Sequence, residues 1–299
     1  MCKENNKRNL ASLVLLNWNV NQSAIISKKT LLPDYVVTII NEEVKPDIFV
    51  LTEVFDLKNE NEILKEKFTN YELVYADRKA EDKKNEILIG IKKDNDITLV
   101  PNSVKYLSRY NKDMNPNFLS ITVKYNNSEI VIIGVRIRAV SDDEREEQFK
   151  MVLSCLEIIP SETKIICACD LNPKCSIENY RKHIDLEEKD LKKKLPASKR
   201  WSYWWIKSKL SPRFGVITPN KGWSWVSDKN QLFINDHIIT RKDMITNVGG
   251  QKVCYVWDFM NKEEAKEDYE GLKSRDFKSE TNRIGIPDHA ILLAKIKLE

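Results

Sequence analysis

Short apolar runs recur along the whole chain, and several of them contain or end in a single polar residue. The runs are only a few residues long and rich in β-branched side chains, which favours buried strands over helices. We therefore expect strands from one end of the chain to the other, at residues 13–20, 47–54, 71–76, 86–93, 117–125, 129–139, 163–171, 231–240 and 289–298.

Helical patterns separate some of these runs, at residues 30–44, 59–68, 142–159 and 176–194. The third of them opens with Ser141 and three acids, which suit a helix N-terminus. Strands and helices that mix without strict alternation indicate an α/β (α+β) domain built in layers. The chain has no internal repeat and no strong linker, so we expect a single domain over residues 1–299, with residues 1–10 as a flexible N-terminus.

Composition places the chain among soluble globular proteins. Of the 299 residues, 41% are hydrophobic and 31% are charged, and a net charge of +4 permits an anionic partner without requiring one. The apolar stretch near the N-terminus is short and lacks a small-residue cleavage site, so we interpret it as the first strand. No apolar run reaches the roughly 18 residues of a transmembrane helix, and we expect no membrane partner.

The six cysteines predict free thiols better than they predict a metal site. No pair has C-x-x-C spacing, and Cys167 and Cys169 flank Ala168 in an apolar run, so both should point to one face of a buried strand. Reduced core thiols are favoured over disulfides, which indicates a reducing compartment and predicts a cytoplasmic location.

Polar residues at strand ends are the most informative feature for function. An acid inside a buried run is costly unless it is paired or binds a metal. Each such residue alone is explained more simply as a satisfied core group or a cap, but a whole set at strand ends favours a shared site. The set comprises Asn17, Asn19, Glu53, Asp170, Asn172, Asp236, His237, Asp288 and His289.

Five of these segments resemble, in order, the motifs of the endonuclease/exonuclease/phosphatase superfamily. They are NWN at 17–19, PDIFVLTEV at 46–54, CDLNP at 169–173, NDHIIT at 235–240 and PDHAIL at 287–292. The resemblance runs from about residue 13 to the C-terminus. It implies the deoxyribonuclease I-like fold, a four-layer sandwich of two packed mixed β-sheets flanked by helices, with the site at one end of the sandwich.

The resemblance also implies a metal site. Glu53 and Asn19 would hold the cation, Glu53 directly, and Asp236 would complete the metal or polar shell. A hard cation such as Mg²⁺ takes oxygen ligands, few of them carboxylates, which suits this set. We expect Mg²⁺, with Mn²⁺ as the alternative, acting as a Lewis acid on the phosphate and the leaving oxygen.

The remaining motif residues would carry the chemistry of phosphodiester hydrolysis. By the resemblance, Asp170 and Asn172 orient the nucleophilic water and contact the scissile phosphate. Asp288 would pair with His289, which would fix the tautomer of the imidazole and raise its basicity. General acid–base help of this kind is worth roughly 10²–10⁴-fold in rate.

One position departs from the family pattern. Many members carry a histidine in an Asn-x-His-Leu string, and here the matching stretch GVRIRA has Arg136 instead. The chain holds three histidines, at positions 183, 237 and 289, so a two-histidine scheme is incomplete. Apurinic endonucleases also lack this histidine, so loss of activity does not follow. Arg136 either clamps a phosphate oxygen or pairs with an acid, and both readings stay open.

Several other residues are candidates for substrate contact. Arg138 should share the strand face of Arg136, whereas Arg145 and Gln148 lie in the following helix and face either the site or solvent. In the family, the segment matching KGWSWV lies near the substrate, so Trp223 and Trp225 are candidates to line the site. The alternative is that both tryptophans pack in the core.

A basic and aromatic segment at residues 192–209 fits phosphates and stacked bases. It also fits a solvated lysine-rich helix end followed by an aromatic core strip, which we favour slightly. His237 should point away from Asp236 on a strand, so we do not assign it a catalytic role, and His183 should be a surface residue.

Together these features predict a magnesium-dependent phosphodiester hydrolase, most simply a nuclease acting on DNA or RNA. One alternative is a hydrolase of a small or lipid phosphoester, of the inositol phosphate or sphingomyelin type. Against it, the CDLNP motif lacks the arginine that inositol 5-phosphatases tend to carry after this asparagine. The other alternative is a non-catalytic nucleic-acid-binding relative, which only Arg136 supports.

Overall fold

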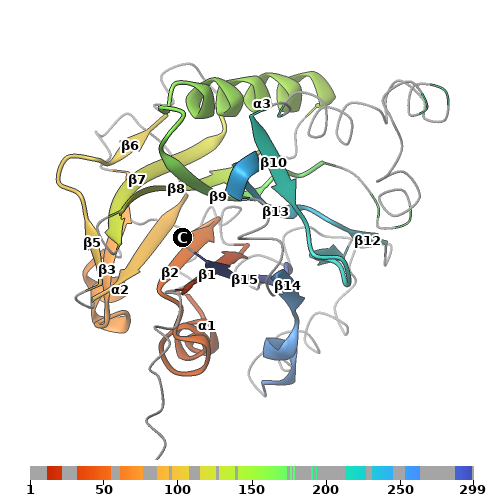
Figure 1. Cartoon of the computed structure of the whole chain (residues 1–299). Helices are drawn as coiled ribbons and strands as arrows, with labels where there is room; N and C mark the ends of the chain where they lie inside the picture. The colour runs from red at the N-terminus through yellow and green to blue at the C-terminus, as the bar shows by residue number, and fades with distance from the viewer. Residues whose placement is uncertain are drawn as a thin grey trace, which may run out of the picture.

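The structure is a computed structural model of the whole chain (Figure 1). It describes Ser176, Glu178, Asp190, Lys193 and Leu210 and the ranges 12–21, 32–54, 61–76, 86–93, 96–107, 115–125, 128–138, 141–173, 213–226, 231–244, 253–262 and 287–297. The segment 1–10 and nearly all of the segments 176–194 and 192–209 lie outside these residues, so the structure does not address the predictions made for them.

The first sheet contains both the first and the last strand of the chain. Its central strand β1 pairs antiparallel with β15 and parallel with β2. The six strands follow the order β14 (Val253–Val256), β15 (Ile291–Lys297), β1 (Ser12–Asn19), β2 (Ile48–Thr52), β4 (Leu88–Lys92) and β3 (Tyr71–Tyr75).

The second sheet is built around the parallel pair β8 and β9. The strands follow the order β10 (Phe214–Ile217), β13 (Asp236–Arg241), β9 (Lys164–Asp170), β8 (Ser128–Arg136), β7 (Asn117–Tyr125) and β5 (Ile97–Leu99), and β6 (Lys105–Tyr106) also pairs with β7. A separate two-stranded ribbon joins β11 (Trp225–Val226) to β12 (Leu232–Phe233).

Helices cover the outer faces of both sheets (Figure 1). The α-helix α3 (Asp142–Glu157) lies over the second sheet, and α1 (Asp34–Thr38), the π-helical turn η1 (Ile39–Val44) and α2 (Asn61–Lys67) pack on the first. Two short 3₁₀ turns follow later in the chain, η2 (Lys242–Met244) and η3 (Asp258–Asn261).

Alternation along each strand explains this layering. In β1, Leu13 and Leu15 face the core between the two sheets, whereas Leu16 and Trp18 face the layer of helices on the first sheet. Because central strands are buried on both faces, they appear in the sequence as nearly continuous apolar runs. The structure is thus the predicted four-layer sandwich of two packed sheets flanked by helices.

Most predicted elements are found, with a few corrections. The predicted capping box is present: the Ser141 hydroxyl accepts from the Glu144 backbone N–H, and the Glu144 carboxylate accepts from the Ser141 N–H. The predicted helix at 30–44 starts later and turns π-helical after Thr38. The predicted strand at 231–240 is two strands, because residues 234–235 interrupt it.

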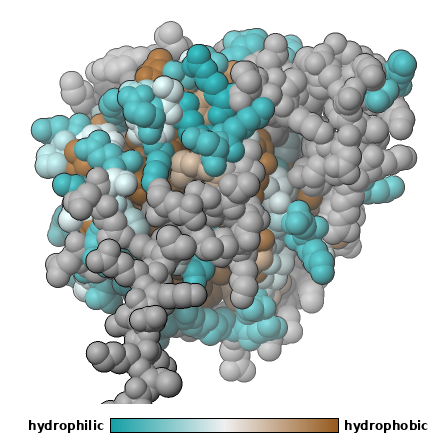
Figure 2. Space-filling model, viewed as in Figure 1, coloured by the Kyte–Doolittle hydropathy of each residue, from teal (hydrophilic) through white to brown (hydrophobic). Residues whose placement is uncertain are grey.

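The predicted thiol arrangement is also observed. Cys167 and Cys169 both face the hydrophobic cluster beneath α3, and the four described cysteines, which include Cys155 and Cys254, are free. On the face drawn in Figure 2, hydrophilic side chains cover much of the described surface, and hydrophobic ones show between them. Within the described residues, no helix is long and apolar enough to cross a membrane.

Candidate active site

Strand direction brings the polar strand ends to one edge of the sandwich. The parallel strands β1 and β2 finish at Asn19 and just before Glu53, and the parallel strands β8 and β9 finish at Arg136 and Asp170. The antiparallel strand β13 begins at this same edge, where Asp236 pairs in register with Asp170. The common edge therefore collects residues from widely separated parts of the sequence.

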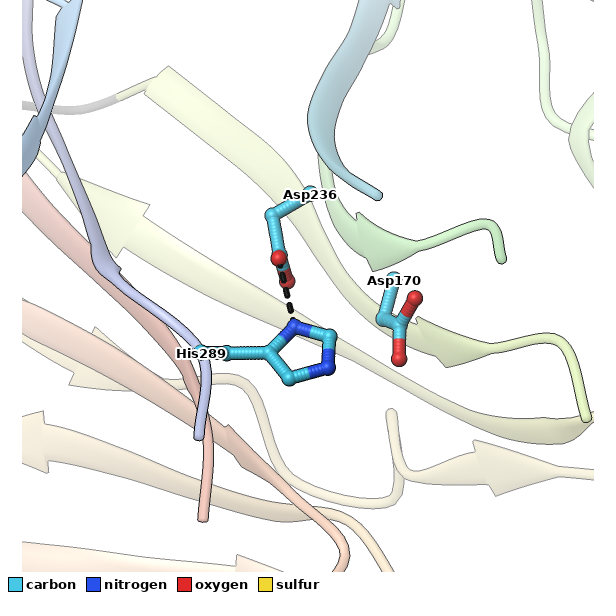
Figure 3. Close-up of side chains that lie close together, drawn as sticks. All are labelled: Asp170, Asp236 and His289. Carbon is cyan, nitrogen blue, oxygen red and sulfur yellow. Dashed lines mark hydrogen bonds and ion pairs between the residues drawn. The ribbon is translucent and has the colours of Figure 1, made fainter. Parts of the chain in front are cut away.

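A buried histidine lies between two buried aspartates at this edge (Figure 3). Nδ1 of His289 lies 2.7 Å from Oδ2 of Asp236, and one ligand atom from each of Asp170, Asp236 and His289 lies within 4.8 Å of the others. The indole N–H of Trp18 donates to the backbone carbonyl of His289 at 2.9 Å. The imidazole is thus fixed at both its ring and its backbone.

The charges in this cluster shift the pKa values of its members. Burial alone would lower the pKa of His289, but the charge and hydrogen bond of Asp236, together with Asp170 and Asp288, raise that pKa to about 10. Burial raises the pKa of Asp170 to about 7, although His289 and Arg136 oppose this rise. At neutral pH the site therefore holds an imidazolium beside a carboxyl group that is able to exchange its proton.

The structure corrects the predicted pairing of Asp288 with His289. Oδ1 of Asp288 lies 4.0 Å from Nε2 of His289, and its Oδ2 accepts a hydrogen bond from the Trp225 indole N–H at 2.9 Å. Consecutive residues of an extended chain point in opposite directions, which explains why Asp236 makes the short contact instead. Asp236 itself, which we had assigned to the metal shell, holds the histidine through Oδ2.

Asn19 joins two of the acids. Its carboxamide nitrogen donates to Glu53 Oε1 and to Asp170 Oδ2, both at 2.9 Å. Its oxygen accepts from the backbone N–H of Asn21 at 2.9 Å. Asn19 therefore positions the Glu53 and Asp170 carboxylates, and its role as a metal ligand stays a prediction.

Asn172 is held beside Asp170. Its backbone N–H donates to Asp170 Oδ1 at 3.0 Å, and its side chain donates to Asp170 Oδ2 at 3.1 Å and to the Ile137 carbonyl at 2.6 Å. Its backbone has a φ of 41°, and that of Glu53 has a φ of 61°. Left-handed backbone at non-glycine residues is uncommon and clusters at functional sites, so both side chains are presented by turns that the fold imposes.

Arg136 pairs with two acids of the first sheet. Its Nη2 lies 2.5 Å from Glu53 Oε1, and its Nη1 lies 3.3 Å from Glu86 Oε2. Asn117, which stands opposite Arg136 in the strand register, donates to the same oxygen of Glu86 at 3.3 Å. Of the two readings left open by the sequence, the structure displays the pairing with acids.

Neither a protein-family model nor a curated protein sequence matches this chain. Solved structures do match it over nearly its full length. TDP2 of D. rerio in complex with a single-stranded DNA product is 16% identical, covers 96% of this chain and 100% of its own, and has a TM-score of 0.54. An endonuclease/exonuclease/phosphatase from Bacteroides vulgatus is 13% identical over 97% and 100% of the two chains, with a TM-score of 0.60.

A third match is ANGEL2, described as a 2',3'-cyclic phosphatase. It is 13% identical over 95% of this chain and 94% of its own, with a TM-score of 0.57. This is the fold of the endonuclease/exonuclease/phosphatase superfamily. Since these identities are low, the likeness establishes the fold, and the roles of individual residues are argued from the geometry above.

The sequence predicted a divalent cation, and the residues at the edge fit one. Hard cations select oxygen ligands, and Glu53, Asp170 and Asp236 offer buried carboxylates. Oδ1 of Asp236 is buried and has no hydrogen-bond partner among the described residues. Nδ1 of His289 is already engaged by Asp236, and the resemblance assigns the cation to Glu53.

The other candidates for substrate contact divide into two groups. The Trp225 ring lies 6.3 Å from the His289 ring between centroids, so Trp225 does line the site. Trp223 packs on Trp257 instead, with the ring centroids 6.4 Å apart. Strand β8 ends at Arg136, so Arg138 lies beyond the shared strand face that we predicted, and its backbone N–H donates to Gln148.

Arg145 and Gln148 lie on the buried face of α3 itself, and both are fully buried, so neither faces solvent. His237 points away from Asp236, as predicted, and its Nδ1 lies 2.8 Å from the Thr218 hydroxyl. His183 and, apart from Lys193, the basic and aromatic segment lie outside the described residues.

Three functional neighbours were not singled out from the sequence. Glu86 and Asn117 stand at the starts of predicted strands, the same signal that marked the other site residues, and both were overlooked. Ser224 was hidden between two tryptophans. Its hydroxyl accepts from the backbone N–H groups of Asn235 and Asp236 at 2.7 and 3.1 Å, and its carbonyl accepts from the N–H of Ala290, which ties the starts of β13 and β15 together.

Proposed function

We propose that this protein is a divalent-metal-dependent phosphodiester hydrolase that acts on nucleic acid. The observation that carries the proposal is the Asp236–His289 pair facing Asp170, next to the Glu53 carboxylate, at one edge of the sandwich. A cation-binding carboxylate beside an imidazolium and a titratable acid is the set that phosphoester hydrolysis requires.

The side chains would divide the reaction between them. Glu53 would hold the cation, which supplies Lewis-acid polarisation of the phosphate when bound. Asp170, whose pKa is about 7, is suited to accept a proton from the attacking water, and Asn172 keeps its carboxylate oriented. The protonated His289 is suited to neutralise charge that develops on a phosphoryl oxygen, and Asp236 holds it in place.

Two further observations support a nucleic-acid substrate over a small ester. The chain is mildly basic overall, with a net charge of +4, which is compatible with a polyanionic substrate. One of the structures that shares its fold, TDP2 of D. rerio, was obtained with a single-stranded DNA product. The free cysteines support our further proposal of a reducing compartment, such as the cytoplasm.

The test is hydrolysis by the purified protein of supercoiled plasmid, single-stranded DNA and RNA, an RNA ending in a 2',3'-cyclic phosphate, inositol phosphates, sphingomyelin and bis(p-nitrophenyl) phosphate. Each substrate is tried with Mg²⁺, with Mn²⁺ and with EDTA. We expect cleavage of a nucleic acid that EDTA stops and that His289→Ala abolishes. Arg241→Met serves as the matched control, because Arg241 is at the opposite end of β13 from Asp236.

The other outcomes reject the proposal in distinguishable ways. Turnover of inositol phosphates or sphingomyelin alone would assign the site to small or lipid phosphoesters. Salt-sensitive retention of nucleic acid with no turnover would make the protein a binding relative. Cleavage that persists in EDTA would remove the metal from the mechanism.

A further inference from the structure

The guanidinium of Arg136 lies between two buried carboxylates, and only one of them belongs to the proposed metal site. Glu53 Oε1 is 2.5 Å from Nη2, and Glu86 Oε2 is 3.3 Å from Nη1. The three side chains are 14%, 10% and 7% exposed in the order Arg136, Glu53, Glu86, so water screens their charges weakly.

The contact on Glu53 falls on one of the two oxygens through which this carboxylate could bind a cation. Glu53 Oε1 also accepts from the Asn19 carboxamide, so this oxygen already has two donors. Oxygen atoms of a carboxylate bind a hard cation through the same lone pairs that accept hydrogen bonds. A divalent ion that approaches Glu53 therefore meets a resident positive charge. If it binds through Oε1, it also displaces a charge-assisted hydrogen bond.

Glu86 provides a place for the displaced guanidinium. It precedes β4, and its backbone carbonyl accepts from the N–H of Val54, which places it next to the turn that presents Glu53. Asn117 donates to Glu86 Oε2 from the second sheet and so steadies the carboxylate. The planar fork of arginine presents several donors, so Arg136 is able to release Glu53 while it keeps its contact with Glu86.

We propose that Arg136 is a built-in competitor of the divalent cation at Glu53, and that Glu86 determines how strongly it competes. The inference rests on the proposed function, because it takes Glu53 as the cation ligand. It makes Arg136 a residue that sets metal affinity, and it assigns Glu86 the role of retaining the guanidinium when the cation binds.

The experiment is titration of the full chain with Mn²⁺ alone, without substrate and at one fixed pH, followed by calorimetry and by the electron paramagnetic resonance of free Mn²⁺. Arg136→Met removes the competing charge and should tighten Mn²⁺ binding by about tenfold or more, because charges in a poorly screened site interact strongly. Arg136→Gln, which keeps polar contacts, should act in the same direction and serves if the methionine variant does not fold.

Glu86→Gln should act in the opposite direction. Because the neutral side chain attracts the Arg136 guanidinium less strongly, Arg136 should pair more strongly with Glu53. Mn²⁺ affinity should then fall by roughly fivefold or more. In the Arg136→Met background the same substitution should cost only about twofold, since residues in contact are not additive. If Glu86→Gln changes Mn²⁺ affinity much less in the Arg136→Met background, Glu86 acts through Arg136. If Glu86 only contributed a negative charge, the change would be the same in both backgrounds.

Two controls keep this inference distinct from the proposed function. Arg138→Met removes the same charge two positions along the chain and should change Mn²⁺ affinity by less than about threefold. Glu53→Gln should abolish tight binding. If Glu53→Gln has no effect, the proposed metal site is wrong. If Glu53→Gln weakens binding but both Arg136 variants leave it unchanged or weaker, the competitor role is wrong and the metal site stands.

Discussion

Asp236 and His289 meet at 2.7 Å although 53 positions separate them in the chain. The contact joins the first residue of β13 in one sheet to the residue that precedes β15 in the other by two positions. It therefore ties the two sheets together at the edge where the acids collect, and it sets the orientation of the only described imidazole that faces Asp170 (Figure 3).

This contact predicts unequal roles for two neighbouring aspartates. Asp236→Asn should lower the hydrolysis rate nearly as much as His289→Ala, by roughly 10²–10⁴-fold, because each removes the oriented imidazolium. Asp288→Asn should cost less, since its carboxylate is 4.0 Å from Nε2 and is bonded to Trp225. Single-turnover rates at saturating Mg²⁺ measure this. If Asp288→Asn lowered the single-turnover rate more than Asp236→Asn, Asp288 would be the functional partner of His289, as expected from the sequence.

The buried His237 predicts a loss of stability in mild acid. Burial lowers its pKa to about 4, whereas the unfolded chain titrates near its ordinary value of 6.5. The unfolded state therefore takes up a proton first. The stabilisation is complete above about pH 6.5 and is lost as the pH falls towards 4, by at most about 3 kcal/mol.

The measurement is urea unfolding of the parent and of His237→Asn between pH 7 and pH 4.5. Asparagine keeps a polar atom near the Thr218 hydroxyl, which lies 2.8 Å from Nδ1. The difference in unfolding free energy between the two proteins should shrink or reverse at the acidic end. A difference that stays constant across this range would show that His237 does not contribute to the acid sensitivity.

Close packing on the outer face of the first sheet predicts that Gly90 tolerates no side chain. A Cβ at this position would lie 2.1 Å from two carbons of the Phe49 ring, which stands opposite it in the strand register. Gly90→Ala should therefore destabilise the fold by about 1–3 kcal/mol or more through overpacking. Urea unfolding of the double variant with Phe49→Leu checks the cause, because it should lose less stability than the sum of the two single variants.

Arg241 predicts a stability effect that is separate from catalysis. Its guanidinium donates to the carbonyls of Ile159 and Pro160 at 2.8 and 2.6 Å, just after α3 ends, and lies over the Phe214 ring. Arg241→Met should cost about 1–2 kcal/mol, because these partly buried carbonyls lose a charged donor. The thermal midpoint should fall while the rate per folded molecule is unchanged. A drop in that rate at a temperature where the variant is folded would contradict this separation.

Local patterns were sufficient to predict most of the longer strands and helices, whereas the four-layer arrangement was implied by the resemblance to the superfamily. Alternating and continuous apolar runs marked the central strands, and Ser141 with its following acids marked the start of α3, because burial and capping depend on residues close in sequence. The short strands β5, β6, β10, β11 and β14 were not predicted, since strands of two to four residues carry too little periodicity to be distinguished from loops.

The sequence by itself determined which residue types end the strands, and hence that Asn19, Glu53, Asp170, Asp236 and His289 are candidates for one site. It could not determine which of these side chains contact one another. The choice of Asp236 over Asp288 as partner of His289, and the placement of Arg136 between Glu53 and Glu86, depend on how the two sheets face each other. That arrangement is set by packing between strands far apart in the chain, which no local pattern encodes.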